Sequence, residues 1–178
     1  LKMWLGWENA SECMVLVELL NTLRLSRIAL HARTGKQQYK GHPDLEAFQG
    51  FYELCQHPLY YNGGIESLSD IRQILTRFPL LKGVFIGRGL LSSPLLAKEF
   101  KGNETFLPEQ RMSIYFAFHE ELFSAYSQVL QGETQLLVKM KTLWEYFLPE
   151  TDRKLLKRIK KSTRLQQYTE SVKAIFTS

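Results

Sequence analysis

The sequence predicts an α/β protein with a parallel sheet, followed by a separate all-α helical bundle. From residue 1 to about residue 100, short apolar runs alternate with helical patterns four times. They recur roughly every 25 to 30 residues, which is the spacing of βαβ units. The apolar runs have the composition of strands that are buried on both faces of a sheet. After residue 102 only helical patterns follow.

Composition narrows the class of protein. The chain has 178 residues, 44% of them hydrophobic and 12% aromatic, which is enough for a globular core. We expect no signal peptide, and no apolar run reaches membrane-spanning length. Cys13 and Cys55 form no CxxC pair, so we expect two inert packing residues in a reduced, cytoplasmic protein with no membrane association. The formal net charge of +5 matters only where it is concentrated.

The first strand is expected at residues 1–5 and ends at Gly6. Asn9 or Ser11 can cap the helix that follows, whose apolar positions recur at helical spacing from Val15 to Leu23. The second strand is expected at residues 28–31, and a longer polar loop follows it.

Pro43 and Asp44 open the next helix, which carries its apolar residues on one face. The third strand is expected at residues 59–62, and the stretch from residue 67 to 70 resembles a capping box with Asp70 in place of the usual Glu. The fourth strand is expected at residues 84–86. Ser93 and Pro94 are then expected to cap and start one more helix.

Four such units form half of an eight-stranded TIM (β/α)8 barrel. The last two strands end in glycine-bearing turns at residues 62–64 and 87–89. Glycine lets the backbone approach an anion closely, and barrels typically place a phosphate site in the loops after their last two strands. These strands are therefore assigned as strands five to eight of a barrel. The alternative is a small, open doubly wound sheet.

The helical part is expected at residues 103–178, after a β/α domain at residues 1–102. Its helices are predicted at residues 108–130, 133–148, 151–161 and 164–176. Basic residues crowd the end of the chain: Arg153, Lys154, Lys157, Arg158, Lys160, Lys161 and Arg164. Such a face suits nucleic-acid phosphates, although charge patterning taken alone favours a solvated helix face.

The carboxyl ends of barrel strands converge on one mouth. Lys2, His31, Arg33, Asn62 and Arg88 can therefore share a cationic pocket, suited to an anionic ligand that carries a ring. A lone histidine is more often structural, and tight turns need glycine in any case. Four strands that all end in such residues are a stronger signal than any one of them. No metal site is expected.

Four segments resemble the tRNA-dihydrouridine synthases in content, order and spacing. They are LKMWLGW at residues 1–7, HARTGKQQYKG at 31–41, NGGI at 62–65 and IGRG at 86–89. The resemblance covers roughly residues 1 to 100. It implies an FMN-bearing β/α barrel followed by a helical tRNA-binding domain. It also implies reduction of uridine in tRNA to 5,6-dihydrouridine, with NADPH as electron source.

The resemblance also implies roles for particular residues. The flavin-ring contacts are Lys2 and His31, and the FMN-phosphate contacts are Asn62, Gly63, Gly64, Gly87 and Arg88. The implied contacts to the uridine and its phosphates are Arg33, Lys36, Gln38 and Tyr39. The uridine has to be flipped out of the tRNA, because a stacked base cannot reach the flavin. Contacts of the helical domain to tRNA are Arg153, Lys154, Lys157, Arg158 and Lys161.

Two departures from the family pattern matter. The family usually has Arg where this chain has Trp4, which puts a polar contact near the flavin or substrate in doubt. The family's catalytic cysteine, which protonates the uracil ring after hydride transfer, belongs to the first half of the barrel. Neither Cys13 nor Cys55 stands in a matching motif, so we expect no catalytic residue in this chain and no activity of the chain by itself. Without the first four strands, exposed sheet edges predict self-association.

Two other functions fit parts of the pattern. Another FMN barrel oxidoreductase, of the dihydroorotate or dihydropyrimidine type, shares the phosphate turns but does not call for a basic helical tail. A non-catalytic RNA-binding protein needs only the basic helix. Bound flavin together with salt-sensitive tRNA binding favours the synthase over both.

Overall fold

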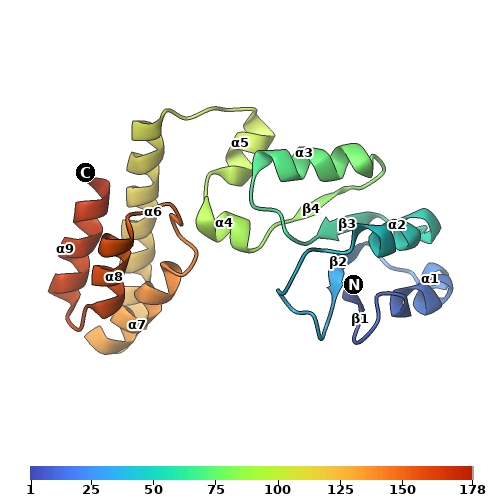
Figure 1. The fold of residues 1–178 in the computed structure, drawn as a ribbon, viewed down its shortest axis with the longest axis horizontal. Helices are drawn as coiled ribbons and strands as arrows, with labels where there is room; N and C mark the ends of the chain where they lie inside the picture. The colour runs from blue at the N-terminus through green and yellow to red at the C-terminus, as the bar shows by residue number, and fades with distance from the viewer. Residues whose placement is uncertain (178) are drawn as a thin grey trace. The chain divides into compact units, whose positions relative to one another are not determined.

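The structure is a computed structural model that describes residues 1–177 (Figure 1). The chain divides into two compact units, a first unit at Leu1–Gly89 and a helical unit from Leu90 onward. Helix α5 (Leu96–Gly102) therefore belongs to the helical unit, where Glu99 forms an ion pair with Arg111. The domain boundary after residue 102 stays a prediction.

The first unit contains one sheet of four parallel strands in the order β1-β2-β3-β4 (Figure 1). The strands are β1 (Lys2–Gly6), β2 (Ile28–Thr34), β3 (Leu59–Asn62) and β4 (Gly83–Phe85), and the helices that connect them are α1 (Glu12–Thr22), α2 (Leu45–Leu54) and α3 (Leu68–Arg77). Every strand lies beside its neighbour in sequence, as in the wall of a β/α barrel. A doubly wound sheet reverses its strand order at a switch point, and residues 1–177 show no such reversal. The α/β, half-barrel prediction is confirmed.

The face of the sheet against the helices is apolar. Leu30 lies in register between Met3 and Tyr61, and both Leu30 and Tyr61 are buried. The ring of Phe48 from α2 packs against Tyr61, with 4.9 Å between centroids. Since neighbouring residues of a strand point to opposite faces, the alternate residues of the same strands lie on the other face.

Two helix starts follow their sequence signals. The Asp44 side chain accepts a hydrogen bond from the Ala47 backbone N–H at 2.9 Å and caps α2. At α3, Ser67 Oγ accepts from the Asp70 N–H at 3.1 Å, while Asp70 Oδ2 accepts from the Ser67 N–H at 2.8 Å. This reciprocal pair confirms the capping box with Asp in place of Glu.

The prediction that a helix starts at Ser93-Pro94 is wrong. A short helix, α4 (Arg88–Ser92), ends just before this dipeptide, and α5 begins after it, at Leu96. The Ser93 hydroxyl is hydrogen-bonded to the Tyr115 hydroxyl at 2.6 Å and caps no helix. The hydroxyl that the local pattern assigned to capping is therefore used in a contact with a residue distant in sequence.

The helical unit continues with α6 (Pro108–Val129), α7 (Glu133–Leu143), α8 (Arg153–Lys161) and α9 (Leu165–Phe176). These four helices correspond to the predicted four. Helix α7 ends before the predicted residue 148, where Leu148 has a positive φ of 49°. Apolar residues from these four helices and from the segment after α7 form one buried core, with Met140, Phe147, Ile159 and Tyr168 fully buried.

His119 lies inside this core. The Trp144 Nε1–H donates to the Tyr168 hydroxyl at 2.9 Å, and this hydroxyl is 2.7 Å from His119 Nε2. Burial lowers the pKa of His119, so its ring is neutral. Because the Glu120 carboxylate near Nδ1 can only accept, the proton lies on Nδ1 and the Tyr168 hydroxyl donates to Nε2. His119 is a satisfied structural residue.

Candidate functional site

One row of side chains crosses the sheet near the carboxyl ends of the strands. Trp4 lies in register with His31, His31 with Asn62, and Asn62 with Phe85. Residues in register on parallel strands project from the same face, so this row lies on the face opposite Leu30. The rings of Trp4 and His31 meet edge to face, with 5.3 Å between centroids.

A pocket of about 170 Å³ opens over this row. It is lined by Lys2, Trp4, His31, Tyr39, Asn62, Gly63, Gly64, Ile65, Glu66, Phe85, Gly87 and Arg88. Every residue predicted to contact the cofactor is in this set, and the set combines residues from all four strands or the turns after them. The structure brings these residues together; their role as FMN contacts stays a prediction.

The pocket carries an excess of positive charge. Burial, together with the nearby charges of Arg33, Lys2 and Arg88, lowers the pKa of His31 from 6.5 to about 4. His31 is therefore a neutral ring at pH 7, surrounded by cations. The Glu66 carboxylate lies 4.0 Å from the Arg88 guanidinium, at the limit of an ion pair, and its side chain is largely exposed. This arrangement favours an anionic ligand.

The two glycine turns border the pocket and pack against each other. Gly63 and Gly64 have positive φ values of 143° and 57°, which side chains rarely tolerate. A Cβ on Gly89 would lie 2.3 Å from the Ile65 carbonyl oxygen, so the close approach of the two turns requires glycine there. A Cβ on Gly87 would meet nothing within 4 Å, so the backbone at Gly87 faces open space.

The Asn62 side chain also connects the two turns. Its side-chain Nδ2–H donates to the Phe85 carbonyl at 2.9 Å and ties the end of β3 to the end of β4. The same side chain lines the pocket. Asn62 thus fixes the spacing of the two turns that border the candidate anion site.

Arg33 lies beneath the loop after β2, and its side chain is buried. Its two terminal nitrogens donate to the carbonyls of Lys40 at 2.8 Å and Gly41 at 2.9 Å. Its Nε is buried and has no hydrogen-bond partner among residues 1–177. The structure thus places Arg33 as a clamp of the loop; the predicted contact to substrate stays a prediction.

The other loop residues predicted to meet substrate lie apart. Tyr39 lines the pocket, and the Arg88 guanidinium sits over its ring at 4.5 Å from the centroid. Lys36 forms an exposed ion pair with Glu8. Gln38 is exposed and has a positive φ of 51°. Of these, the structure brings only Tyr39 to the pocket.

The pocket lining also contains Ile65, Glu66 and Phe85, which the sequence reasoning missed, and Trp4, at a position that the family resemblance places near the flavin or substrate. A signal for Trp4 existed, because residues two apart in a strand share a face and Lys2 was already placed at the pocket. Phe85 becomes recognisable only from the register of β4 against β3.

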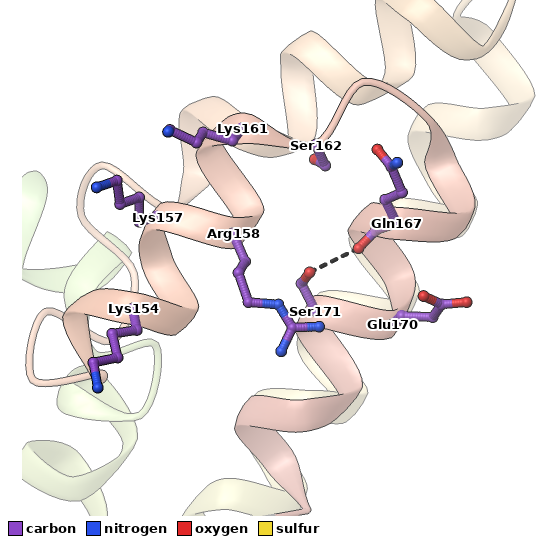
Figure 2. A pocket seen from close by; sticks show the side chains of 8 residues that line it. All are labelled: Lys154, Lys157, Arg158, Lys161, Ser162, Gln167, Glu170 and Ser171. Atoms are coloured by element: carbon purple, nitrogen blue, oxygen red, sulfur yellow. Dashed lines mark hydrogen bonds between the residues drawn. The ribbon is translucent and has the colours of Figure 1, made fainter.

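A second site is a groove of about 480 Å³ between α8 and α9 (Figure 2). It is lined by Lys154, Lys157, Arg158, Lys161, Ser162, Gln167, Glu170 and Ser171. Figure 2 shows the three lysines projecting from α8 away from α9, and Arg158 projecting between the two helices. Among residues 1–177 no salt bridge to any of these cations is found. Arg153, predicted with this set, is exposed at the start of α8, outside the groove.

Neither cysteine lies at these sites. Cys13 is buried in α1 and donates to the Ala10 carbonyl, and Cys55 follows α2. Burial raises the pKa of both thiols, so both are protonated at pH 7. Within residues 1–177 no group of three or more His, Cys, Asp or Glu side chains is arranged to hold a metal ion. In that same part of the chain, every helix is too short or too polar to cross a membrane.

A cationic, glycine-bordered pocket at the carboxyl ends of parallel β/α strands is where proteins of the TIM-barrel class place a phosphate site. The family model described as dihydrouridine synthase (Dus) matches residues 1–177. The chain therefore belongs to the dihydrouridine synthase family, as the four sequence segments predicted.

Individual relatives agree with this assignment. The chain is similar to a probable tRNA-dihydrouridine synthase of Rhizobium leguminosarum bv. phaseoli, 34% identical over 95 residues, covering 53% of this chain and 30% of that protein. A probable tRNA-dihydrouridine synthase of Aquifex aeolicus is 34% identical over 100 residues, 56% of this chain and 31% of that protein. The tRNA-dihydrouridine(16) synthase of Escherichia coli is 27% identical over 108 residues, 60% and 34% of the two chains. The matches thus span about a third of the length of these relatives.

Proposed function

We propose that this chain supplies the FMN-binding and tRNA-binding parts of a cytoplasmic tRNA-dihydrouridine synthase. The reaction is reduction of uridine in tRNA to 5,6-dihydrouridine, with NADPH as the electron donor. When bound, FMN supplies hydride transfer to the base. The observation that carries the proposal is the single pocket formed by all seven predicted cofactor contacts, in a chain of the dihydrouridine synthase family.

The residues present fit the phosphate group of FMN. Gly87 leaves open space where any other residue would place a side chain, so a phosphate can approach the backbone closely. The Arg88 guanidinium lines the same pocket and would provide charge-assisted hydrogen bonds to a phosphate.

Lys2 and His31 suit the ring system of FMN. They lie on β1 and β2, away from the phosphate turns after β3 and β4. The Lys2 ammonium would stabilise negative charge on the ring system, and a neutral His31 can offer one hydrogen-bond donor without adding charge.

The lysines of α8 suit the phosphates of tRNA. Lys154, Lys157 and Lys161 are spaced by three and four residues, so they form one stripe on the helix. The stripe is about 10 Å long at a rise of 1.5 Å per residue. Cations at this spacing bind a phosphate backbone without reading its sequence.

Titration of FMN and of unmodified tRNA into the 178-residue chain tests the proposal. We expect the chain to bind FMN. The affinity for FMN should fall about tenfold or more in Arg88→Gln, because a charge-assisted contact is lost. We also expect tRNA affinity to fall steeply with salt. Binding of FMN without tRNA would favour another FMN oxidoreductase. Binding of tRNA without FMN would favour a non-catalytic RNA-binding protein.

The chain by itself is expected to be inactive. Protonation of the uracil ring needs an acid at the pocket, and neither Cys13 nor Cys55 lines it. An assay of the chain with FMN, NADPH and unmodified tRNA should show no dihydrouridine by mass spectrometry. Clear turnover would contradict this expectation, while leaving the binding results to decide the proposed function.

A further inference from the structure

Trp4 has no structural explanation in the core of the first unit. It lies on the pocket face of β1 with 38% of its surface exposed. Its ring contacts His31 edge to face at 5.3 Å. No hydrogen bond from its indole N–H is found within residues 1–177. A large aromatic side chain left open at a pocket is available to a ligand.

The position of Trp4 in the sheet indicates which part of a ligand it meets. The turns suited to phosphate follow β3 and β4, whereas Trp4 lies on β1. Neighbouring strands are about 4.8 Å apart, so Trp4 is roughly 10 to 14 Å from the phosphate turns across the sheet. A phosphorylated ligand held at Arg88 therefore extends its far end toward β1.

The surroundings of Trp4 suit a planar heterocycle. Lys2, two residues earlier on the same face, provides positive charge for a polar edge. The neutral ring of His31 and the indole of Trp4 provide flat, polarisable surfaces. Aromatic side chains stack favourably on planar bases in such sites.

We propose that Trp4 is the aromatic wall at the ring end of this pocket, and that a planar pyrimidine-type heterocycle binds against its indole. This inference rests on the proposed function. Two ligands of that function carry such a ring: the flavin, whose isoalloxazine contains a pyrimidine edge, and the target uracil. The indole acts as a binding and specificity-determining surface.

The test compares Trp4→Leu, which removes the aromatic ring, with Trp4→Phe, which keeps one. Trp7→Phe is the matched control, because Trp7 is 66% exposed and lies outside the pocket lining. The probes are FMN, riboflavin and, with FMN-loaded protein, uridine monophosphate. Affinities come from flavin and tryptophan fluorescence, and circular dichroism checks that each variant is folded. Riboflavin lacks the phosphate, so it reports the ring end separately from Arg88.

We expect Trp4→Leu to weaken one ring-bearing probe about tenfold or more, and Trp4→Phe to stay within about threefold. Equal losses for FMN and riboflavin assign the flavin ring to Trp4. A loss confined to uridine monophosphate assigns the target base. Unchanged affinities for all three probes in a folded Trp4→Leu protein would overturn the inference and leave the proposed function intact. If the unchanged chain binds none of the probes, the proposed function fails and the inference fails with it.

Discussion

His31 shows how one residue reports the electrostatics of the whole pocket. Its ring is buried on the pocket face of β2, among Lys2, Arg33 and Arg88. Burial and three nearby cations keep this ring neutral, and the cations favour an anionic ligand. The same surroundings that suit a phosphorylated cofactor therefore suppress protonation of His31.

The suppressed protonation predicts a pH dependence of stability. The pKa of His31 falls from 6.5 to about 4 on folding. Between these pH values the unfolded chain binds more protons than the folded one, so stability falls as the pH drops through this window. We expect His31→Gln to lose less free energy of unfolding than the unchanged chain between pH 7 and pH 5, measured by urea denaturation. His119 contributes equally in both proteins, and equal losses would contradict the prediction.

Arg33 offers a second prediction at this scale. Arg33→Met fills a similar volume but removes both hydrogen bonds to the loop carbonyls of Lys40 and Gly41. We expect a loss of about 2 kcal/mol in the free energy of unfolding. Arg77→Met is the control, because Arg77 pairs with Glu46 on the surface, and such pairs contribute about 0–1 kcal/mol. Similar losses in both variants, by urea denaturation, would refute the role of Arg33 as a clamp.

At the scale of elements, the two glycines of the β4–α4 turn are expected to separate folding from binding. Gly89→Ala places a Cβ 2.3 Å from the Ile65 carbonyl oxygen, so we expect it to destabilise the first unit. Gly87→Ala meets nothing within 4 Å, so we expect an unchanged or slightly raised melting temperature but weaker FMN binding. Calorimetry and FMN titration of both variants check this. Full FMN affinity in Gly87→Ala would show that no phosphate lies there.

Local signals predicted two helix starts correctly, whereas Ser11 at the start of α1 forms no side-chain capping hydrogen bond. The Asp44 cap and the Ser67–Asp70 capping box depend on neighbours three residues away, and both formed as expected. Ser93 failed as a cap because Tyr115 takes its hydroxyl. The site residues differ in the same way. The glycine turns are recognisable in the sequence, whereas Phe85 is placed at the pocket only by the register of β4 against β3.

Helix α8 gives the prediction for tRNA. Neutralising Lys154, Lys157 and Lys161 to Gln removes the stripe without touching the buried core residue Ile159. We expect the slope of log affinity against log salt to become shallower by about 2 to 3, at roughly 0.7 to 0.9 per phosphate contact. Lys98→Gln is the control, since Lys98 already pairs with Glu104. An unchanged slope in the triple variant would place the tRNA elsewhere.

At the scale of the molecule, the first unit exposes apolar surface on α1. Val15, Leu16 and Leu19 are 82%, 45% and 59% exposed, and β1 is an edge of the sheet among the described strands. Unpaired edges and apolar faces favour association with another chain. We expect the sedimentation coefficient to rise with concentration, and Val15→Lys with Leu19→Lys to reduce the rise. A monomer at all concentrations would contradict self-association.

The three tryptophans give each unit of this chain its own intrinsic fluorescence signal. Trp144 is 2% exposed and hydrogen-bonded to Tyr168 in the core of the helical unit, whereas Trp4 and Trp7 are partly exposed in the first unit. Emission from a buried indole lies at shorter wavelength than emission from a hydrated one. The blue edge of the spectrum therefore follows melting of the helices, and the red edge follows ligands arriving at the sheet. Unfolding of the two units can be timed separately in one cuvette, with no dye attached.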